Sequence, residues 1–134
     1  GTPMEVLSKV ASGGEMSRVK LALKSVLSQH TSLSCQIFDE IDTGVSGSTA
    51  ERVGAAMKAL SKRQQVITIT HLSQVAAYGD QHWKVEKIQS DTTTNTSVTS
   101  LNDSERVQEV ARMLSGALIT NAALKQAEVL LYRD

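Results

Sequence analysis

"IFDEIDTG", residues 37–44, runs an apolar segment directly into a group of acids. Asp39 and Glu40 are adjacent, and Asp42 follows two positions later. Adjacent carboxylates repel each other, and beside apolar residues they also lose hydration. This arrangement costs stability unless a cation or a reacting group compensates, so it indicates a chemical role for the end of the segment.

The bulk composition limits the class of protein. The chain has 134 residues, enough for one domain with a modest core. Its 14 Lys and Arg residues balance 14 Asp and Glu residues, which argues against a strongly basic nucleic-acid surface on the chain taken alone. The one cysteine, Cys35, cannot form an internal disulfide, which fits a reducing compartment. We identify neither a signal peptide nor a bilayer-spanning apolar run, and we expect no membrane partner.

Helical and strand-like patterns alternate in the first part of the chain. Ser12 and Glu15 have the spacing of a capping box, and so do Ser48 and Glu51. Apolar residues follow each box at helical spacing, and between and after these helices lie short β-branched or apolar runs. The predicted elements are a helix over 11–30, a strand over 34–38, a helix over 46–63, a strand over 65–70 and one or two helical turns closed by Gly79.

The second part of the chain predicts a hairpin and two helices. Residues 82–88 alternate and residues 93–100 are polar and Thr-rich, a pattern typical of an antiparallel hairpin with one wet face, at a sheet edge. One helix is predicted with its cap near Asn102 and a last helix from about Thr120. No repeat or linker interrupts residues 1–134, so we expect a single α/β unit.

The order strand, helix, strand over residues 34–70 predicts a βαβ unit, whose strands are parallel with a right-handed crossover. Parallel strands end at the same edge, where open α/β sheets bind ligands. Asp39 and Glu40 end the first strand and His71 follows the second, so we expect them to converge. One carboxylate could hold a divalent cation, the other could orient or deprotonate a water, and the imidazole could contact a transferring group.

The glycine pair predicts an anion site. Ser12, Gly13 and Gly14 stand at a helix start, where backbone N–H groups are accessible and the helix dipole favours an anion such as phosphate. An anion cradle, two carboxylates with separate roles and a polar histidine together indicate phosphoryl transfer.

Each of these features also has a purely structural interpretation. The Ser-Gly-Gly segment can be a capped helix start, the acid pair an exposed turn after a strand, and His71 a hydrogen-bonded structural residue. His30 and His82 do not make a metal-ligand spacing with His71, so a zinc site is not expected. The functional interpretation depends on the joint occurrence of the features in this order.

These motifs resemble those of an ABC-type ATPase head, in the variant found in SMC-like bacterial DNA repair proteins. The similarity covers Lys9 to the end. Ala11 and Glu15 replace the Leu and Gln usual in transporters, and both changes fit the SMC-like variant. The matching strings are "ASGGE" (11–15, signature), "CQIFDE" (35–40, Walker B), "IDTGVSG" (41–47, D-loop) and "ITH" (69–71, switch histidine).

The resemblance implies a role for each motif residue. Asp39 would assist Mg²⁺ through its water shell, Glu40 would polarise the attacking water, and His71 would sense the γ-phosphate of ATP. Asp42, in the D-loop, would act across a dimer interface. The signature residues that would contact ATP held by a second head are Ser12, Gly13, Gly14 and Glu15.

One motif of the family is absent from the sequence. No G-x-x-x-x-G-K-[ST] occurs, so the chain has no P-loop. The first residue is Gly1, and the resemblance implies that the chain is the C-terminal lobe of a split head. The P-loop lobe and a coiled coil would belong to the same, longer protein. The expected partners are that P-loop lobe, a second head in an ATP-dependent dimer, and DNA, in the bacterial cytoplasm at the nucleoid. Alone, the lobe is expected to be inactive.

Three hypotheses follow. The first is an ATPase half-site that drives head dimerisation in DNA double-strand break repair, where the DNA role rests wholly on the resemblance. The second is a non-enzymatic interaction domain of the same fold. The third is a stand-alone acid–base hydrolase that uses Glu40 and His71, although no Ser or Cys nucleophile with a paired base is evident.

Overall fold

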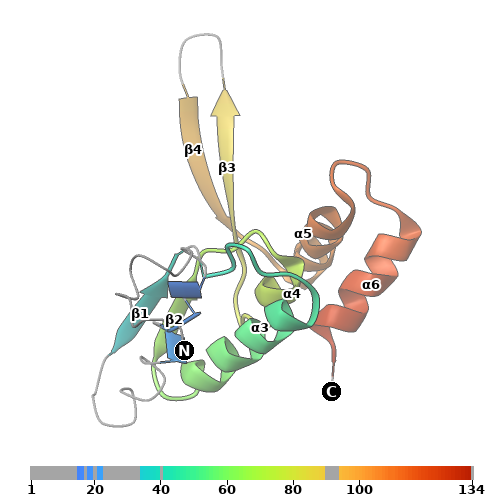
Figure 1. The fold of residues 1–134 in the computed structure, drawn as a ribbon. Helices are drawn as coiled ribbons and strands as arrows, with labels where there is room; N and C mark the ends of the chain where they lie inside the picture. The colour runs from blue at the N-terminus through green and yellow to red at the C-terminus, as the bar shows by residue number, and fades with distance from the viewer. Residues whose placement is uncertain are drawn as a thin grey trace. The chain divides into compact units, whose positions relative to one another are not determined.

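The computed structural model describes residues 15–16, 18–19, 21–22, 34–39, 41–89 and 94–133 (Figure 1). The chain divides into two compact units, Gly1–Val75 and Ala76–Asp134. We call them the strand–helix unit and the hairpin unit, and each is described by itself. The prediction that the chain works as a single lobe stays a prediction.

The strand–helix unit contains the predicted βαβ arrangement. Strand β1 (Cys35–Phe38), helix α3 (Gly47–Ser61) and strand β2 (Gln65–Thr68) follow one another, and the two strands pair in parallel with Phe38 opposite Thr68. The mixed α/β class is therefore confirmed. The predicted second strand, 65–70, was two residues too long. Ile69 still donates its N–H to the Phe38 carbonyl at 2.9 Å, but the residues after it bind a side chain instead of a strand.

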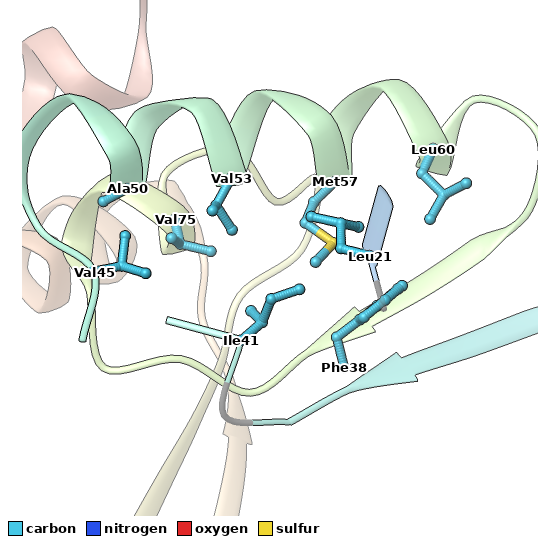
Figure 2. Close-up of a cluster of buried hydrophobic side chains, with 9 residues drawn as sticks. All are labelled: Leu21, Phe38, Ile41, Val45, Ala50, Val53, Met57, Leu60 and Val75. Carbon is cyan, nitrogen blue, oxygen red and sulfur yellow. The ribbon is translucent and has the colours of Figure 1, made fainter. Parts of the chain in front are cut away.

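Helix α3 packs on one face of the strand pair. Strand residues alternate, so Gln36 and Phe38 are buried while Cys35 and Ile37 are exposed. Figure 2 shows side chains from α3 meeting Phe38 and Ile41 in a shared apolar cluster. The members of this cluster are Leu21, Phe38, Ile41, Val45, Ala50, Val53, Met57, Leu60 and Val75. The predicted helical stripe of Val53, Met57 and Leu60 is thus confirmed as core.

The predicted capping box at Ser48 and Glu51 is wrong. The N-cap of α3 is Ser46, whose side chain makes no capping bond, and Ser48 lies inside the helix. Two backbone features accompany the start of α3 before Ser48. The Val45 N–H donates to the Asp42 carbonyl at 3.1 Å, and Gly47 has a positive φ of 52°, which glycine adopts without strain. The helix therefore begins as soon as the buried Val45 has been placed.

The hairpin unit confirms the predicted order of a hairpin and two helices. Strands β3 (Trp83–Gln89) and β4 (Thr94–Ser100) pair antiparallel, followed by α5 (Asp103–Ser115) and α6 (Asn121–Leu131). Asn102 and Glu105 form a reciprocal capping box on α5, and the Thr120 side chain caps α6. The core of this unit is Ala77, Val110, Ala111, Ala123, Ala127 and Leu130.

The sequence predicted the hairpin at a sheet edge, but the described strands form no larger sheet that includes it. Within the described ranges, β3 and β4 pair only with each other and form a separate two-stranded sheet. An ion pair joins this sheet to α5, because Lys84 Nζ lies 3.4 Å from Glu109 Oε2. Burial alone would raise the pKa of Glu109, but the Arg112 hydrogen bond and the charges of Arg112 and Lys84 lower it overall. A charged contact therefore links the hairpin to α5.

Helix α4 (Ser73–Ala76) is a single turn, which confirms the short helical segment predicted before Gly79. The Gly79 N–H donates to the Ala76 carbonyl at 3.2 Å. Across the part of the chain that the structure describes, no helix combines the length and apolar character that a bilayer crossing needs.

Candidate functional site

The candidate site lies where β1 and β2 end. Because Ile69 N–H bonds to the Phe38 carbonyl, Asp39 and Thr70 are the next residues on two adjacent strand ends. Asp39 is exposed there, and His71 follows Thr70. The parallel pairing therefore brings Asp39 and His71 to the same edge of the sheet, as the sequence predicts. Glu40 lies outside the described residues.

Asp42 connects the two strand ends. Its carboxylate is 3% exposed, and its Oδ2 accepts a hydrogen bond from the His71 backbone N–H at 3.0 Å and a short one from the Thr70 hydroxyl. The Thr70 hydroxyl oxygen in turn accepts from Leu72 N–H at 3.0 Å. A buried carboxylate needs such donors to offset its lost hydration. These bonds fix the backbone that carries His71.

The His71 imidazole also touches Asp42. Nδ1 lies 3.3 Å from Asp42 Oδ2, while 73% of the side chain is exposed. The two ring nitrogens lie on different edges of the imidazole, so contact through Nδ1 leaves Nε2 available to a ligand. Asp42 therefore contacts the ring at Nδ1, and the edge that carries Nε2 is available to a ligand.

The loop that carries Asp42 is a tight turn. Gly44 has φ 68°, a left-handed conformation that favours glycine, and the turn closes through the Val45 N–H. Arg18 Nη1 donates to the Thr43 carbonyl at 3.5 Å, so a residue of the first predicted helix reaches this loop. Glu15 lies in the described part of that helix and is exposed. The predicted anion cradle, Ser12 with Gly13 and Gly14, lies outside the described residues.

A metal ion would find a limited donor set here. Within the described residues, no three His, Cys, Asp or Glu side chains cluster as ligands. Mg²⁺ commonly keeps several waters and uses one or two carboxylates together with substrate phosphates. An exposed Asp39 at a strand end suits that water-mediated mode, and the chemistry of the residues present fits Mg²⁺.

The structure shows contacts in the candidate site that the sequence did not predict. Asp42 and His71 were both predicted as site residues, but their direct contact was not. Thr70 was missed altogether as a member of the site. The only available signal for Thr70 was its position between a strand and a candidate histidine, which is too general to identify a hydrogen-bonding role.

Comparison with solved structures defines the class of fold. One similar structure comes from work on ATP-driven dimerisation and DNA-stimulated activation of SMC ATPases, with 23% identity, a TM-score of 0.61, and coverage of 88% of this chain and 70% of the other. Another is an Smc head domain with a coiled coil and joint from Pyrococcus yayanosii, with 24% identity, a TM-score of 0.64, and coverage of 80% and 20%. The fold is that of an SMC ATPase head.

Sequence relatives add a second line of comparison. The chain is 49% identical over 132 residues to the DNA repair protein RecN of Rickettsia conorii. It is 49% identical over 131 residues to RecN of Treponema pallidum and 44% over 131 residues to RecN of Haemophilus influenzae. These alignments cover 98% of this chain and 23% or 24% of the relatives, so the chain spans about a quarter of their length. No family model matches the chain. The chain is homologous to a segment of the RecN proteins, which confirms the predicted resemblance.

Proposed function

We propose that this chain is the C-terminal lobe of a split SMC-like ATPase head that binds and hydrolyses ATP in DNA double-strand break repair. The observation that carries the proposal is the shared edge of β1 and β2, where Asp39 and His71 follow the two strand ends and Asp42 joins those ends. The homology to RecN segments supports the setting in DNA repair. The proposed place of that repair is the bacterial cytoplasm, at the nucleoid.

In the proposed reaction, each site residue has a separate role. Asp39 would hold Mg²⁺ through water, and the ion would supply positive charge to neutralise the phosphate oxygens. Glu40 accepts a hydrogen bond from the attacking water and orients it. His71 contacts the γ-phosphate through the ring edge opposite Asp42. In the intact protein, the signature residues 12–15 of one head contact ATP that is held by the other head.

The missing P-loop implies a second lobe, and the strand pair offers it a surface. Ile37, Ile67 and Ile69 are 61%, 43% and 55% exposed on the face of β1 and β2 opposite α3. Parallel sheets are usually covered on both faces. We assign this isoleucine face to the P-loop lobe, because relatives about four times longer supply a large amount of additional chain.

Reconstitution tests the proposed activity. The chain is co-expressed with the P-loop-bearing half of a curated RecN relative, and ATP hydrolysis and ATP binding are measured separately. We expect turnover from the pair and none from the chain alone. Glu40→Gln is expected to abolish turnover while ATP binding persists, because a neutral amide polarises the attacking water much less than a carboxylate does. Glu51→Gln, which changes an exposed carboxylate on α3, serves as the matched control.

The results separate this function from the alternatives. Turnover at the wild-type level in the Glu40→Gln pair would remove Glu40 from its assigned role. Hydrolytic activity of the isolated chain without ATP would favour a stand-alone hydrolase. If Asp39→Ala altered partner binding with no effect on nucleotide binding or turnover, the chain would be an interaction domain.

A further inference from the structure

We propose that Asp42 is a positioning residue that acts within its own chain, by holding the His71 imidazole so that Nε2 faces the nucleotide. This inference rests on the proposed ATPase function. It differs from the role across a dimer interface that the family resemblance implies for Asp42. The contacts of its buried carboxylate carry the inference.

The first step is that the carboxylate of Asp42 is already engaged within its own chain. Oδ2 accepts from the Thr70 hydroxyl, from the His71 N–H at 3.0 Å, and lies 3.3 Å from His71 Nδ1. With 3% of the side chain exposed, little of it remains for a second subunit. The partners lie 28 and 29 positions away in sequence, so these bonds tie the loop after β1 to the residues after β2.

The second step concerns the proton on the imidazole. An ionised carboxylate only accepts hydrogen bonds, and its negative charge 3.3 Å from Nδ1 favours a proton on that nitrogen. In the neutral ring, Nε2 then carries the lone pair, and in the charged ring it carries a second N–H. Asp42 therefore selects which nitrogen is free to meet the ligand, as well as where that nitrogen lies.

The Asp42→Asn variant distinguishes the position of the His71 imidazole from the choice of the ring nitrogen that carries the proton. The amide has nearly the same shape and its oxygen can still accept from Thr70 and from the His71 backbone. However, its NH₂ group can donate to Nδ1, which requires the lone pair there and moves the ring proton to Nε2. The variant should therefore remain folded while the imidazole changes its tautomer.

Nitrogen-15 NMR of the histidine side chains tests the tautomer directly. It is recorded on the chain without nucleotide at about pH 8.5, where free imidazole is neutral, with His71 assigned through His71→Gln. We expect the wild-type His71 to show the Nδ1–H tautomer and Asp42→Asn to shift it towards Nε2–H. An Nε2–H tautomer in the wild-type chain, or no change in the variant, would overturn the inference. The same outcome follows if His71 shows no fixed tautomer.

A double-mutant cycle in the reconstituted head tests whether Asp42 acts through His71. Asp42→Asn is expected to lower kcat for ATP by about 10- to 100-fold, as outer groups that orient a histidine do, with KM little changed. In the His71→Ala background, the same substitution should cost almost nothing more, because the group it positions is gone. Glu51→Gln, which alters an exposed side chain on α3 away from the loop, is the control and should leave kcat unchanged.

The two proposals fail in different ways. Absent turnover in the wild-type pair would contradict the ATPase proposal, while the NMR result still decides the Asp42–His71 contact. Additive losses of kcat for Asp42→Asn and His71→Ala, in a pair that turns over ATP, would instead show that Asp42 acts independently of His71. That outcome would favour a role across the dimer interface.

Discussion

His71 and His82 differ in what surrounds their rings. His71 is exposed and has a carboxylate at Nδ1, whereas His82 is partly buried and its Nδ1 has no hydrogen-bond partner in the described structure. Burial lowers the pKa of His82, the positive charge of Arg106 lowers it further, and Glu109 opposes the change only in part. The surroundings of His82 in the folded state therefore disfavour the charged form of its ring.

This difference predicts how stability depends on pH. With a folded pKa below the ordinary value of 6.5, the folded chain takes up a proton on His82 less readily than the unfolded chain does. Stability contributed by neutral His82 is present above pH 6.5 and is lost as pH falls through the folded pKa. His82→Gln should flatten this part of the stability curve. The measurement is urea unfolding at several pH values, followed by fluorescence of Trp83, the one tryptophan. An unchanged slope would contradict the assignment to His82.

At the scale of residues, the sequence indicates the candidate site residues better than the contacts between them. Asp39, Asp42 and His71 were found because carboxylates and a histidine stand at predicted strand ends. The hydrogen bond from the His71 backbone to Asp42 was not predictable, since it joins positions 29 apart and depends on how the D-loop turns. Thr70 was missed for the same reason.

Among the elements, two similar capping signals had different outcomes. Ser48 and Glu51 fit the local pattern of a capping box, yet Ser48 lies within α3. Asn102 and Glu105 make both reciprocal bonds at 2.9 Å. The difference arises from the approach of the chain, because the turn through Gly44 and the buried Val45 sets the start of α3. A local pattern predicts that a helix begins nearby, whereas tertiary packing fixes the residue at which it does.

This contrast predicts unequal costs for two small substitutions. Asn102→Ala should destabilise the hairpin unit by about 1 kcal/mol, because the Glu105 N–H loses its acceptor at the helix start. Ser48→Ala, at an exposed position inside α3, should change stability by less than about 0.5 kcal/mol. The free energy of unfolding of both variants is measured by chemical unfolding monitored by far-ultraviolet circular dichroism. Equal losses in the two variants would show that the observed caps do not determine stability.

For the whole molecule, the sequence predicted the elements and their order but not the way the sheets are grouped. The βαβ unit, the hairpin and the C-terminal helices are all present. The hairpin was expected at a sheet edge, and within the described residues its strands pair only with each other. A sequence pattern predicts which segments form strands, but strand pairing also depends on tertiary packing. In the proposed head, part of that packing comes from the P-loop lobe, whose sequence is not in this chain.

The isoleucine face provides the test at this scale. If Ile37, Ile67 and Ile69 pack against the P-loop lobe, Ile67→Lys places a charge in an apolar interface and also loses the burial of one isoleucine, worth about 1.5–3 kcal/mol. Binding of the P-loop half should weaken at least about tenfold, measured by titrating the variant chain against the immobilised half. Val129→Lys makes the same kind of change at a 64% exposed position on α6 and should bind as the wild type does. If Ile67→Lys bound as tightly as that control, the P-loop lobe would have to contact the chain elsewhere, and the isoleucine face would need a different partner.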